Sequence, residues 1–491
     1  MRCCGARKEG TQVVQADTLY RYEEVVHFIT GLVHQGILPP GSRAPSLRQI
    51  SRQRAMSLST ALQAYRVLED QGILEARPQS GYYVAAQHRA SLHAPTVSRP
   101  PGHATGVSVA SAVLQLLDYA ADPRLVPLGC AIPSTELLAA SRLDRFLARA
   151  ARVNGLDYNV YTAAQGDPML RRELARRALR WGQALAPEDI VITCGCTEAL
   201  TVALKAVTRP GDTVAIESPT YFGLLHILEA LDLQALELPT DATSGIELDA
   251  LQDALARNAV QACLLSSCFS NPLGYTMLEA KKTAVLDLLA AHDIPLIEDD
   301  IYGEIYFGSE RPKPFMALAP RSNVLYCSSF SKTVAPGYRI GWIAAGRHLR
   351  RVLEQKVALT LCGPALPQLA LAEFLASGGY DSHLRRVRRT FASNIDHMQR
   401  TIEQSFPPGT RVSRPAGGFV LWLELPDSVR SRELFDVALD HGICFAPGDV
   451  FSAGNRYANC LRLSCGHTWQ PRIENGLNTL GKLVCNALAA T

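Results

Sequence analysis

A lysine in a hydroxyl-rich turn is the residue whose neighbours most directly indicate covalent chemistry. Lys332 lies in the segment SSFSKTVAPGYRIGW, directly after an apolar run, with Ser329 and Ser331 beside it and Arg339 after it. A lysine amine becomes nucleophilic when burial or a neighbouring cation disfavours its charged form, and it then forms a Schiff base with an aldehyde cofactor. The two hydroxyls and the guanidinium can bind a phosphate group. A solvated surface lysine, the ordinary alternative, does not explain this clustering.

Polar and aromatic side chains also stand near the ends of other apolar runs. The segment LIEDDIYGE ends in carboxylates, SNPLGYTM carries Asn271, ESPTYFG carries Tyr221, and NCLRLSCG carries Arg462. The segment ITCGCTEAL passes from a strand-like run through a glycine into a helical pattern, so the backbone donors of Cys196 and Thr197 are expected at a helix N-terminus. Helix N-termini bind phosphate because their amide groups are unpaired and the helix dipole favours negative charge.

These motifs, together and in this order, resemble the aspartate aminotransferase superfamily, the fold-type I enzymes of pyridoxal 5′-phosphate, over roughly residues 110 to 485. The resemblance implies that pyridoxal 5′-phosphate is the cofactor and that Lys332 forms the Schiff base with it. It also implies that Asp299 pairs with the pyridine nitrogen, because the Asp-x-x-Tyr spacing to Tyr302 selects Asp299 over Asp300. A buried carboxylate at that place keeps the nitrogen protonated, so that the ring can withdraw electrons.

The same resemblance implies roles for the remaining motif residues. Asn271 and Tyr302 would hydrogen-bond the phenolic oxygen of the cofactor, Tyr221 would stack on its ring, and Tyr161 would reach the phosphate bound in a neighbouring subunit. For the two tyrosines outside LIEDDIYGE, a core aromatic without a ligand remains the alternative. Arg462 would bind the α-carboxylate of a substrate through two parallel hydrogen bonds, which makes the small ligand an amino acid or a related acid.

The elements that must position these residues are short buried strands alternating with helices. The apolar runs DIVIT, DTVAIE, ACLLSSCF, IPLIE and NVLYCSSF are separated by helical patterns such as MLRRELARRALRWG. This alternation predicts an α/β fold with a mostly parallel sheet covered by helices on both faces. The resemblance adds a small C-terminal α+β part. We assign residues 108–491 to this aminotransferase class I/II-like domain.

A separate module precedes the α/β domain. Apolar residues recur at three- and four-residue steps from Leu19, a short helix follows Pro45 and Ser46, and a third helix begins after Ser57. After Gly72, the stretch ILEARPQSGYYV reads as a β-hairpin. Three helices and a hairpin are the parts of a winged helix-turn-helix, which we assign to residues 15–85. Residues 86–107, rich in Pro, Gly, Ser and His, are expected to form a linker.

The module resembles the GntR family through GILPPGSRAPSLRQIS, AYRVLEDQGILEAR and SGYYV, over roughly residues 18 to 85. The resemblance implies that double-stranded DNA is approached by Arg48, Ser59, Thr60, Arg66 and Arg77. Hydroxyls and guanidinium groups suit phosphates and base edges. An ordinary solvated helix face is the alternative. Leu58 stands where many relatives carry a basic residue, so the operator sequence is not predictable.

Composition limits the remaining possibilities. The chain of 491 residues is 47% hydrophobic, enough for more than one core, and its net charge of +3 confines any DNA-binding signal to a local surface. The 13 cysteines are scattered through apolar stretches and indicate neither a disulfide framework nor a metal site. The N-terminus has no apolar signal region, and no apolar run reaches membrane-spanning length. These features favour a cytoplasmic protein without a membrane partner.

The fusion of both modules resembles the MocR/GabR regulators. That resemblance implies a homodimeric, pyridoxal phosphate-dependent transcription regulator that binds a DNA operator and responds to a small amino compound. Such a response requires the ligand to bind two domain arrangements with different affinity. Two alternatives stay open at this point. One is a working aminotransferase with an accessory DNA-binding module, and the other is a repressor whose large domain has lost the cofactor and serves dimerisation.

Overall fold

The chain divides into two compact units, which we describe separately. The computed structural model describes residues 21–34, 37–39, 41–70, 73–77, 80–84, 92–97, 99–153, 157–318 and 323–490. The units are Met1–Ser91 and Leu92–Thr491. Leu19, Gly72 and the expected domain ends at 15 and 85 lie outside the described residues.

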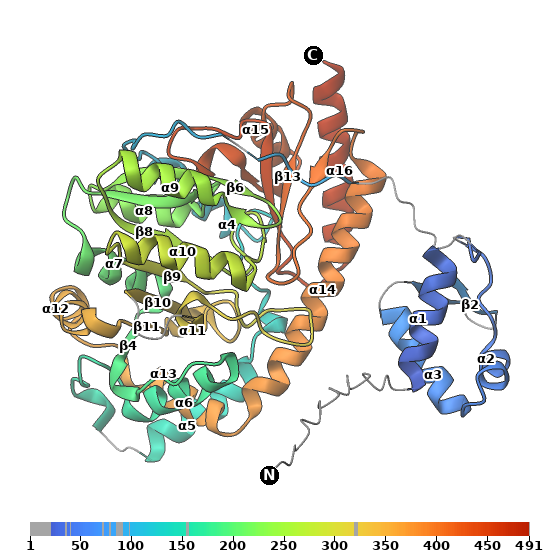
Figure 1. The fold of residues 1–491 in the computed structure, drawn as a ribbon, viewed down its shortest axis with the longest axis horizontal. Coiled ribbons are helices and arrows are strands. Elements are labelled where there is room, and N and C mark those ends of the chain that lie inside the picture. Colours follow the sequence, from blue (N-terminus) through green and yellow to red (C-terminus); the bar gives the residue numbers. More distant parts are fainter. Residues whose placement is uncertain are drawn as a thin grey trace, which may run out of the picture. The chain divides into compact units, whose positions relative to one another are not determined.

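The first unit has the predicted order of three helices and a hairpin (Figure 1). Its helices are α1 (Arg21–His34), α2 (Leu47–Gln53) and α3 (Leu58–Asp70), and its strands are β1 (Leu74–Arg77) and β2 (Gly81–Val84). The two strands are antiparallel, with Leu74 opposite Val84. The winged helix-turn-helix expected from the sequence is therefore confirmed.

Helix caps and one tyrosine hold this unit together. The Ser46 hydroxyl accepts a hydrogen bond from the Gln49 amide (3.2 Å) at the start of α2, and the Ser57 hydroxyl accepts one from Thr60 (3.1 Å) at the start of α3. Side-chain acceptors at these positions pair amides that a helix leaves free. The hydroxyl of buried Tyr65 donates to the Pro45 carbonyl (2.6 Å), so α3 is tied to the segment before α2.

An eight-stranded sheet organises the second unit. Its strand order is β4-β11-β10-β9-β8-β5-β6-β7, and neighbours from β10 to β6 are parallel. The strands are β4 (Ile190–Thr193), β5 (Thr213–Ser218), β6 (Gln234–Asp241), β7 (Gly245–Ile246), β8 (Val260–Leu265), β9 (Leu296–Asp299), β10 (Val324–Ser329) and β11 (Gly341–Ala344). Four of the five apolar runs singled out in the sequence form the central strands β5, β8, β9 and β10, and the fifth, DIVIT, forms the edge strand β4; their side chains are almost entirely buried.

Helices lie against this sheet and extend the unit beyond it (Figure 1). They are α4 (Ala110–Ala120), α5 (Ala140–Val153), α6 (Pro168–Ala178), α7 (Gly195–Val207), α8 (Phe222–Ala230), α9 (Leu248–Arg257), α10 (Glu279–Ala291), α11 (Phe315–Leu318), α12 (Leu349–Thr360) and α13 (Ala365–Ala376). Helix α7 contacts β9, β10 and β11, which places its N-terminus beside the ends of these strands. The mostly parallel α/β sheet is confirmed.

The C-terminal part is a smaller α+β layer, also as expected. A four-stranded antiparallel sheet has the order β12-β13-β16-β15, and α14 contacts α16 beside it. The elements are β12 (Arg411–Val412), β13 (Val420–Glu424), β15 (Ala446–Pro447), β16 (Cys460–Ser464), α14 (Gly379–Ser405), α15 (Ser431–Asp440) and α16 (Pro471–Ala489). A short parallel pair, β3 (Val126–Pro127) with β14 (Ile443–Cys444), joins this layer to the start of the unit.

Part of the expected linker lies on the large unit. The Thr96 amide and hydroxyl donate to the Glu424 carboxylate (2.6 and 2.9 Å), and Thr105 forms an antiparallel bridge with Ala235 of β6. These contacts use backbone groups, a hydroxyl and a carboxylate, none of which requires apolar periodicity in the sequence. The described residues between 92 and 107 therefore belong to the second unit.

In the described part of the chain, no helix combines the length and apolar character needed to cross a membrane.

Candidate functional site

One cavity in the large unit gathers most of the residues expected to bind the cofactor. It has a volume of about 180 Å³. Ten of the expected residues line it, namely Cys196, Thr197, Tyr221, Asn271, Asp299, Tyr302, Ser331, Lys332, Arg339 and Arg462. They come from the end of β9, from segments after β5, β8, β9 and β10, from the start of α7 and from β16, so strands far apart in sequence converge here.

Lys332 follows β10 and points its amine into this cavity. Its Nζ donates to the carbonyl of Ala131 (2.7 Å). Burial and, after it, the positive charge of Arg462 lower the pKa of Lys332 to about 8, against an opposing effect of Asp299. A larger fraction of this amine is therefore neutral near pH 7 than for a solvated lysine, and the neutral form is the nucleophile.

Asp299 ends β9 and faces the same cavity. Its Oδ1 accepts hydrogen bonds from the Ile301 amide (3.2 Å) and the Cys196 thiol (3.6 Å). Burial raises the pKa of Asp299 to about 6, although these two donors lower it. Among the described residues no donor reaches Oδ2, so one oxygen of the carboxylate is available to a ligand nitrogen.

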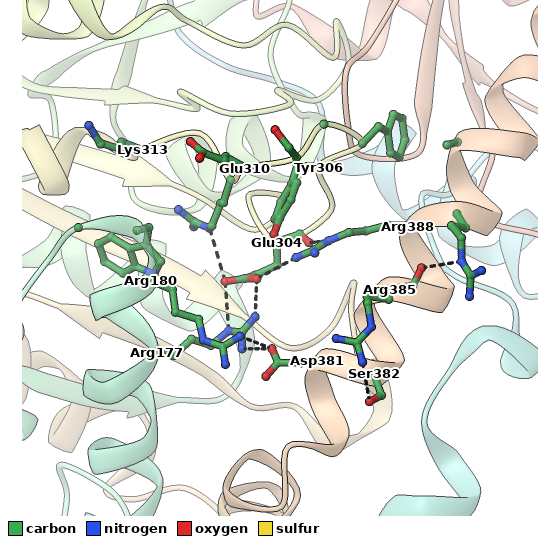
Figure 2. Close-up of a pocket in the computed structure, with 18 of the residues that line it drawn as sticks. Arg177, Arg180, Glu304, Tyr306, Glu310, Lys313, Asp381, Ser382, Arg385 and Arg388 are labelled. Carbon is green, nitrogen blue, oxygen red and sulfur yellow. Dashed lines mark hydrogen bonds and ion pairs between the residues drawn. The ribbon is translucent and has the colours of Figure 1, made fainter. Parts of the chain in front are cut away.

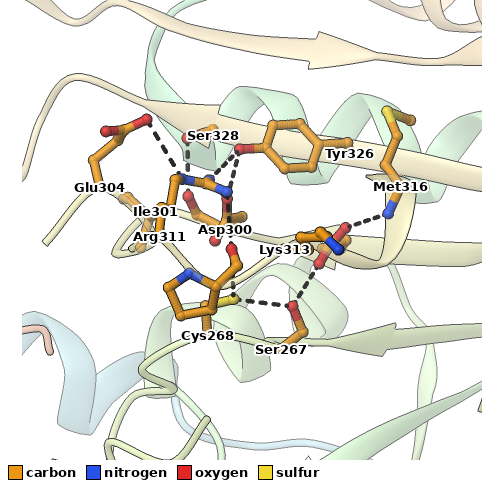
Figure 3. A network of polar contacts seen from close by, with 12 residues as sticks. Ser267, Cys268, Asp300, Ile301, Glu304, Arg311, Lys313, Met316, Tyr326 and Ser328 are labelled. Atoms are coloured by element: carbon orange, nitrogen blue, oxygen red, sulfur yellow. Dashed lines mark hydrogen bonds and ion pairs between the residues drawn. The ribbon is translucent and has the colours of Figure 1, made fainter. Parts of the chain in front are cut away.

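Its neighbour Asp300 points away from the cavity into a polar network (Figure 3). Asp300 pairs with Arg311 and accepts a hydrogen bond from the Tyr326 hydroxyl (2.6 Å), while its carbonyl accepts one from Ser328 (2.9 Å). Both side-chain partners bind Oδ2 of Asp300, whereas its Oδ1 is buried and has no hydrogen-bond partner among the described residues. This network separates the two adjacent aspartates, so that only Asp299 lines the cavity.

The far end of the cavity carries donors suited to a phosphate. Gly195 begins α7 with φ of +81°, and a Cβ there would lie 2.5 Å from Nη2 of Arg339. The guanidinium donates to the Cys194 carbonyl (3.0 Å), which holds it across the helix N-terminus. The Ser331 hydroxyl is buried and has no hydrogen-bond partner among the described residues. Helix amides, a guanidinium and a free hydroxyl form an anion-binding donor set.

Arg462 is a buried cation in the cavity wall. It is fully buried, donates from Nη1 to Oδ1 of Asn271 (3.2 Å) and from Nη2 to the Gly129 carbonyl, and its Nε has no described partner. Within the described chain, no carboxylate forms an ion pair with it. A buried charge without a counter-ion is costly, so this position favours an anionic ligand.

Two other orphaned or aromatic groups complete the wall. The hydroxyl of Tyr302 is buried and without a described hydrogen-bond partner, and burial raises its pKa. A buried donor of this kind normally has a partner, which a ligand oxygen would supply. Tyr221 precedes α8, and its ring lies 4.8 Å from that of Phe222. Together with the orphaned groups of Ser331 and Arg462, the donor set fits pyridoxal 5′-phosphate and an amino acid.

Two expected residues lie elsewhere. Ser329 does not line the cavity, because its hydroxyl accepts a hydrogen bond from the Ser331 amide (3.1 Å) and so shapes the turn before the lysine. Tyr161 is 83% exposed on the surface of the large unit, next to Val160, which is 68% exposed. Its expected role concerns a second subunit, and it does not contact the cavity of its own chain.

Several other residues that line the cavity carry no signal in the sequence. Cys130, Ala131 and Ile132 belong to a loop after β3, and Leu117 comes from α4. None of them lies in a motif of reactive or phosphate-binding residues. Their place follows from the path of the chain across the sheet ends, which local patterns do not report.

The face of α3 expected to meet DNA is polar and open. Ser59 and Arg66 are exposed, and Thr60 is partly exposed. The Ser57 hydroxyl bonds both neighbouring hydroxyls, at 2.7 Å to Ser59 and 2.8 Å to Thr60. Leu58 is 52% exposed at the first turn of α3, where it places an apolar side chain on this face.

The other two residues of this set are also accessible. Arg48 is exposed on α2. Arg77, at the end of β1, pairs with Glu75 (2.6 Å) and lies over the Tyr83 ring (4.3 Å). An exposed pair of this kind is weak, so the guanidinium remains available to a phosphate.

Comparison with known proteins gives the class. Residues 137–479 match the family of class I and II aminotransferases, and residues 21–84 match the gntR family of bacterial regulatory proteins. The chain therefore belongs to the MocR-type GntR regulators, DNA-binding transcription regulators fused to an aminotransferase-like domain. The cofactor of class I and II aminotransferases is pyridoxal 5′-phosphate. These findings confirm the family and the cofactor expected from the sequence.

Individual relatives resemble the whole regulator or its aminotransferase-like domain. The uncharacterized HTH-type transcriptional regulator YdcR of Escherichia coli is 39% identical over 94% of this chain and 99% of its own. The regulator YjiR of the same organism is 35% identical over 95% and 99%. Among solved structures, the α-aminoadipate aminotransferase LysN of Thermus thermophilus, complexed with N-(5′-phosphopyridoxyl)-L-leucine, superimposes with a TM-score of 0.71 at 28% identity, over 78% of this chain and all of LysN.

Proposed function

We propose that this regulator holds pyridoxal 5′-phosphate on Lys332 and senses an amino acid, or a related amine, in the same cavity. The observation that carries the proposal is Arg462, a fully buried cation without a described carboxylate partner. When bound, the cofactor supplies an aldehyde that condenses with amines and a ring that withdraws electrons. An amino acid would bring both the amine for that aldehyde and the carboxylate for Arg462.

The residues of the chain divide the cofactor between them. Lys332 would hold it covalently through Nζ, and Asp299 would hold a proton at the ring nitrogen through its available Oδ2. Tyr302 and Asn271 would donate to the phenolic oxygen, while Tyr221 would stack on the ring. The phosphate would be bound by Ser331, by Arg339 and by the amides of Cys196 and Thr197, with Ser329 shaping the turn.

The mouth of the cavity favours an apolar effector side chain. Leu117 and Ile132 line it and are 47% and 41% exposed, and Ile227 lies deeper in the same wall. Apolar side chains at an open rim lose contact with water when an apolar ligand covers them, which stabilises the complex. A branched or aromatic amino acid therefore suits this rim better than a dicarboxylic one.

DNA binding would be performed by the first unit, through Arg48, Ser59, Thr60, Arg66 and Arg77. We further propose a cytoplasmic homodimer. Exposed Tyr161 and Val160 suit an interface in which the tyrosine reaches a phosphate bound by the partner subunit. A dimer presents two winged helix-turn-helix units to a repeated or palindromic operator. Effector binding would shift the balance between arrangements of these two units.

The test is a spectral titration of the purified protein. L-leucine should change the visible absorbance of the bound cofactor at a far lower concentration than 3-methylbutylamine, which has the same side chain without the carboxylate. Operator affinity measured in parallel should change over the same leucine range. An equal response to the amine and the amino acid would remove Arg462 from the proposed role, and a colourless protein that takes up no cofactor would overturn the proposal.

A working aminotransferase is the second candidate, favoured by the complete set of cofactor-binding residues around Lys332. Incubation with leucine and 2-oxoglutarate separates the two. Many molecules of keto acid formed per protein would assign catalysis, whereas a stable spectral change without turnover would assign sensing.

A further inference from the structure

A broad groove outside the cofactor cavity carries a dense cluster of cations. We call it the arginine groove, and its volume is about 1190 Å³ (Figure 2). Its walls come from α6, from α14 and from the segment after Tyr302, and they hold seven Arg or Lys side chains against three carboxylates. The excess of positive charge distinguishes it from the cofactor cavity, where the cations serve a single small ligand.

The base of the groove is neutralised from within. Glu304 pairs with Arg177 (2.6 Å), Arg388 (3.5 Å) and Arg311 (3.4 Å), as Figure 2 shows in part. Burial alone would raise the pKa of Glu304, but these arginines lower it below its usual value. The carboxylate stays ionised and fixes three guanidinium groups. The base is therefore structural rather than a free anion site.

The rim of the groove, unlike its base, carries arginines that are exposed to solvent. Arg385 and Arg389 are exposed and lie one turn apart on α14. Arg385 donates to the Ser382 hydroxyl (3.0 Å) and Arg389 to the Arg385 carbonyl (3.3 Å), and neither has a carboxylate partner among the described residues. Across the groove, exposed Arg180 shares Asp381 with Arg177. Three guanidinium groups thus face solvent above a rigid base.

We infer that the arginine groove binds the phosphate backbone of duplex DNA. The groove exceeds the range of about 300–1,000 Å³ usual for small-molecule sites, and its free cations lie on the rim rather than around one point. Charge complementarity therefore favours an extended polyanion over a small one.

The first unit supplies a reason for such a second contact. Residues 21–84 contain seven arginines, no lysine and five acidic residues, a net excess of two. Phosphate contacts provide most of the sequence-independent affinity of DNA-binding proteins. A DNA-binding unit with so little excess positive charge gains affinity for DNA when the large unit adds phosphate contacts of its own.

The experiment uses the full-length protein loaded with cofactor. The variant R385Q/R389Q removes two rim cations, and the control R350Q/R400Q removes two exposed arginines of α12 and α14 that each pair with an acidic residue one turn away. Binding to a random-sequence duplex is followed by fluorescence anisotropy at several salt concentrations. Visible absorbance of the cofactor reports that each variant is folded.

The rim variant should bind random duplex about tenfold more weakly at low salt, with a salt dependence shallower by about two phosphate contacts. The control should match the unaltered protein. Preference for operator over random DNA should be unchanged in the rim variant, whereas R66A should lower that preference. Equal affinity and salt dependence for rim and control variants would overturn the inference. So would a rim variant that loses affinity for inorganic tripolyphosphate but not for DNA.

Discussion

The cofactor cavity and the arginine groove both concentrate cations, but they differ in what neutralises them. In the cavity, Arg462 is fully buried and Lys332 is partly buried, and no described carboxylate forms an ion pair with Arg462. In the groove, Arg177, Arg311 and Arg388 share Glu304. A buried cation without a counter-ion indicates a missing ligand, whereas a carboxylate shared by several guanidinium groups indicates structure. The same residue types therefore carry opposite meanings in two parts of one unit.

The strongest test of this contrast removes the cavity lysine. K332A should abolish retention of pyridoxal 5′-phosphate through dialysis. The variant lacks the covalent link, and the phosphate contacts that remain are noncovalent and allow the cofactor to dissociate. Absorbance spectra after dialysis measure the effect. K313A, which removes a half-exposed lysine of the groove paired with Glu279, should keep the full visible band. If K332A retained the band, another amine would have to hold the cofactor.

The second test concerns Arg462. R462Q should weaken the spectral response to L-leucine about 100-fold, since a charge-assisted pair with a buried cation is lost. The visible band without effector should remain, because the cofactor is held by other residues. R456Q, a change at a partly buried arginine that already pairs with Glu237, is the matched control and should leave leucine affinity unchanged.

A third test exchanges the carboxylate at the base of the groove. E304Q should lower the free energy of unfolding by about 2 kcal/mol, less than for a fully buried ion pair because Glu304 is 18% exposed. Urea denaturation followed by absorbance and circular dichroism measures it. E310Q, at an exposed groove position, should have no effect. Equal stability of both variants would remove the structural role assigned to the groove base.

The smallest effect is a pH dependence. Burial and Arg462 lower the pKa of Lys332 to about 8, so the neutral amine predominates above that pH. The rate at which the cofactor-free protein takes up pyridoxal 5′-phosphate should therefore rise with pH and level off above pH 8. R462Q removes one of the two lowering causes and should move the midpoint upward. A midpoint that stays in place would show that burial alone sets the reactivity of the lysine.

Much of the fold and the cavity could be predicted because the information is local. Periodic apolar positions predicted the helices and the hairpin of the first unit, and buried runs predicted the parallel strands of the second. Motifs at strand ends predicted Lys332, Asp299, Tyr302 and Asn271, and all four line one cavity. Parallel strands bring their carboxyl ends to one edge of a sheet. Motif residues at those ends therefore lie close together, independently of the conformation of the connecting loops.

Only the tertiary structure decided where the remaining groups point. Asp299 and Asp300 are adjacent in sequence, yet the partners of Asp300 on the other side of the sheet turn it away from the cavity. Ala131, whose carbonyl accepts the hydrogen bond of Lys332, lies 201 residues from it. Contacts over such distances depend on how loops cross and layers stack.

The arginine groove is the clearest example of a site that the sequence does not predict. Its residues come from α6, α14 and a segment between β9 and β10, each of which reads in sequence as an ordinary charged surface. By itself, the sequence determined the family, the cofactor and the residues of the motifs. The tertiary structure decided which charges are paired, because pairing depends on distances between elements that no spacing along the chain encodes.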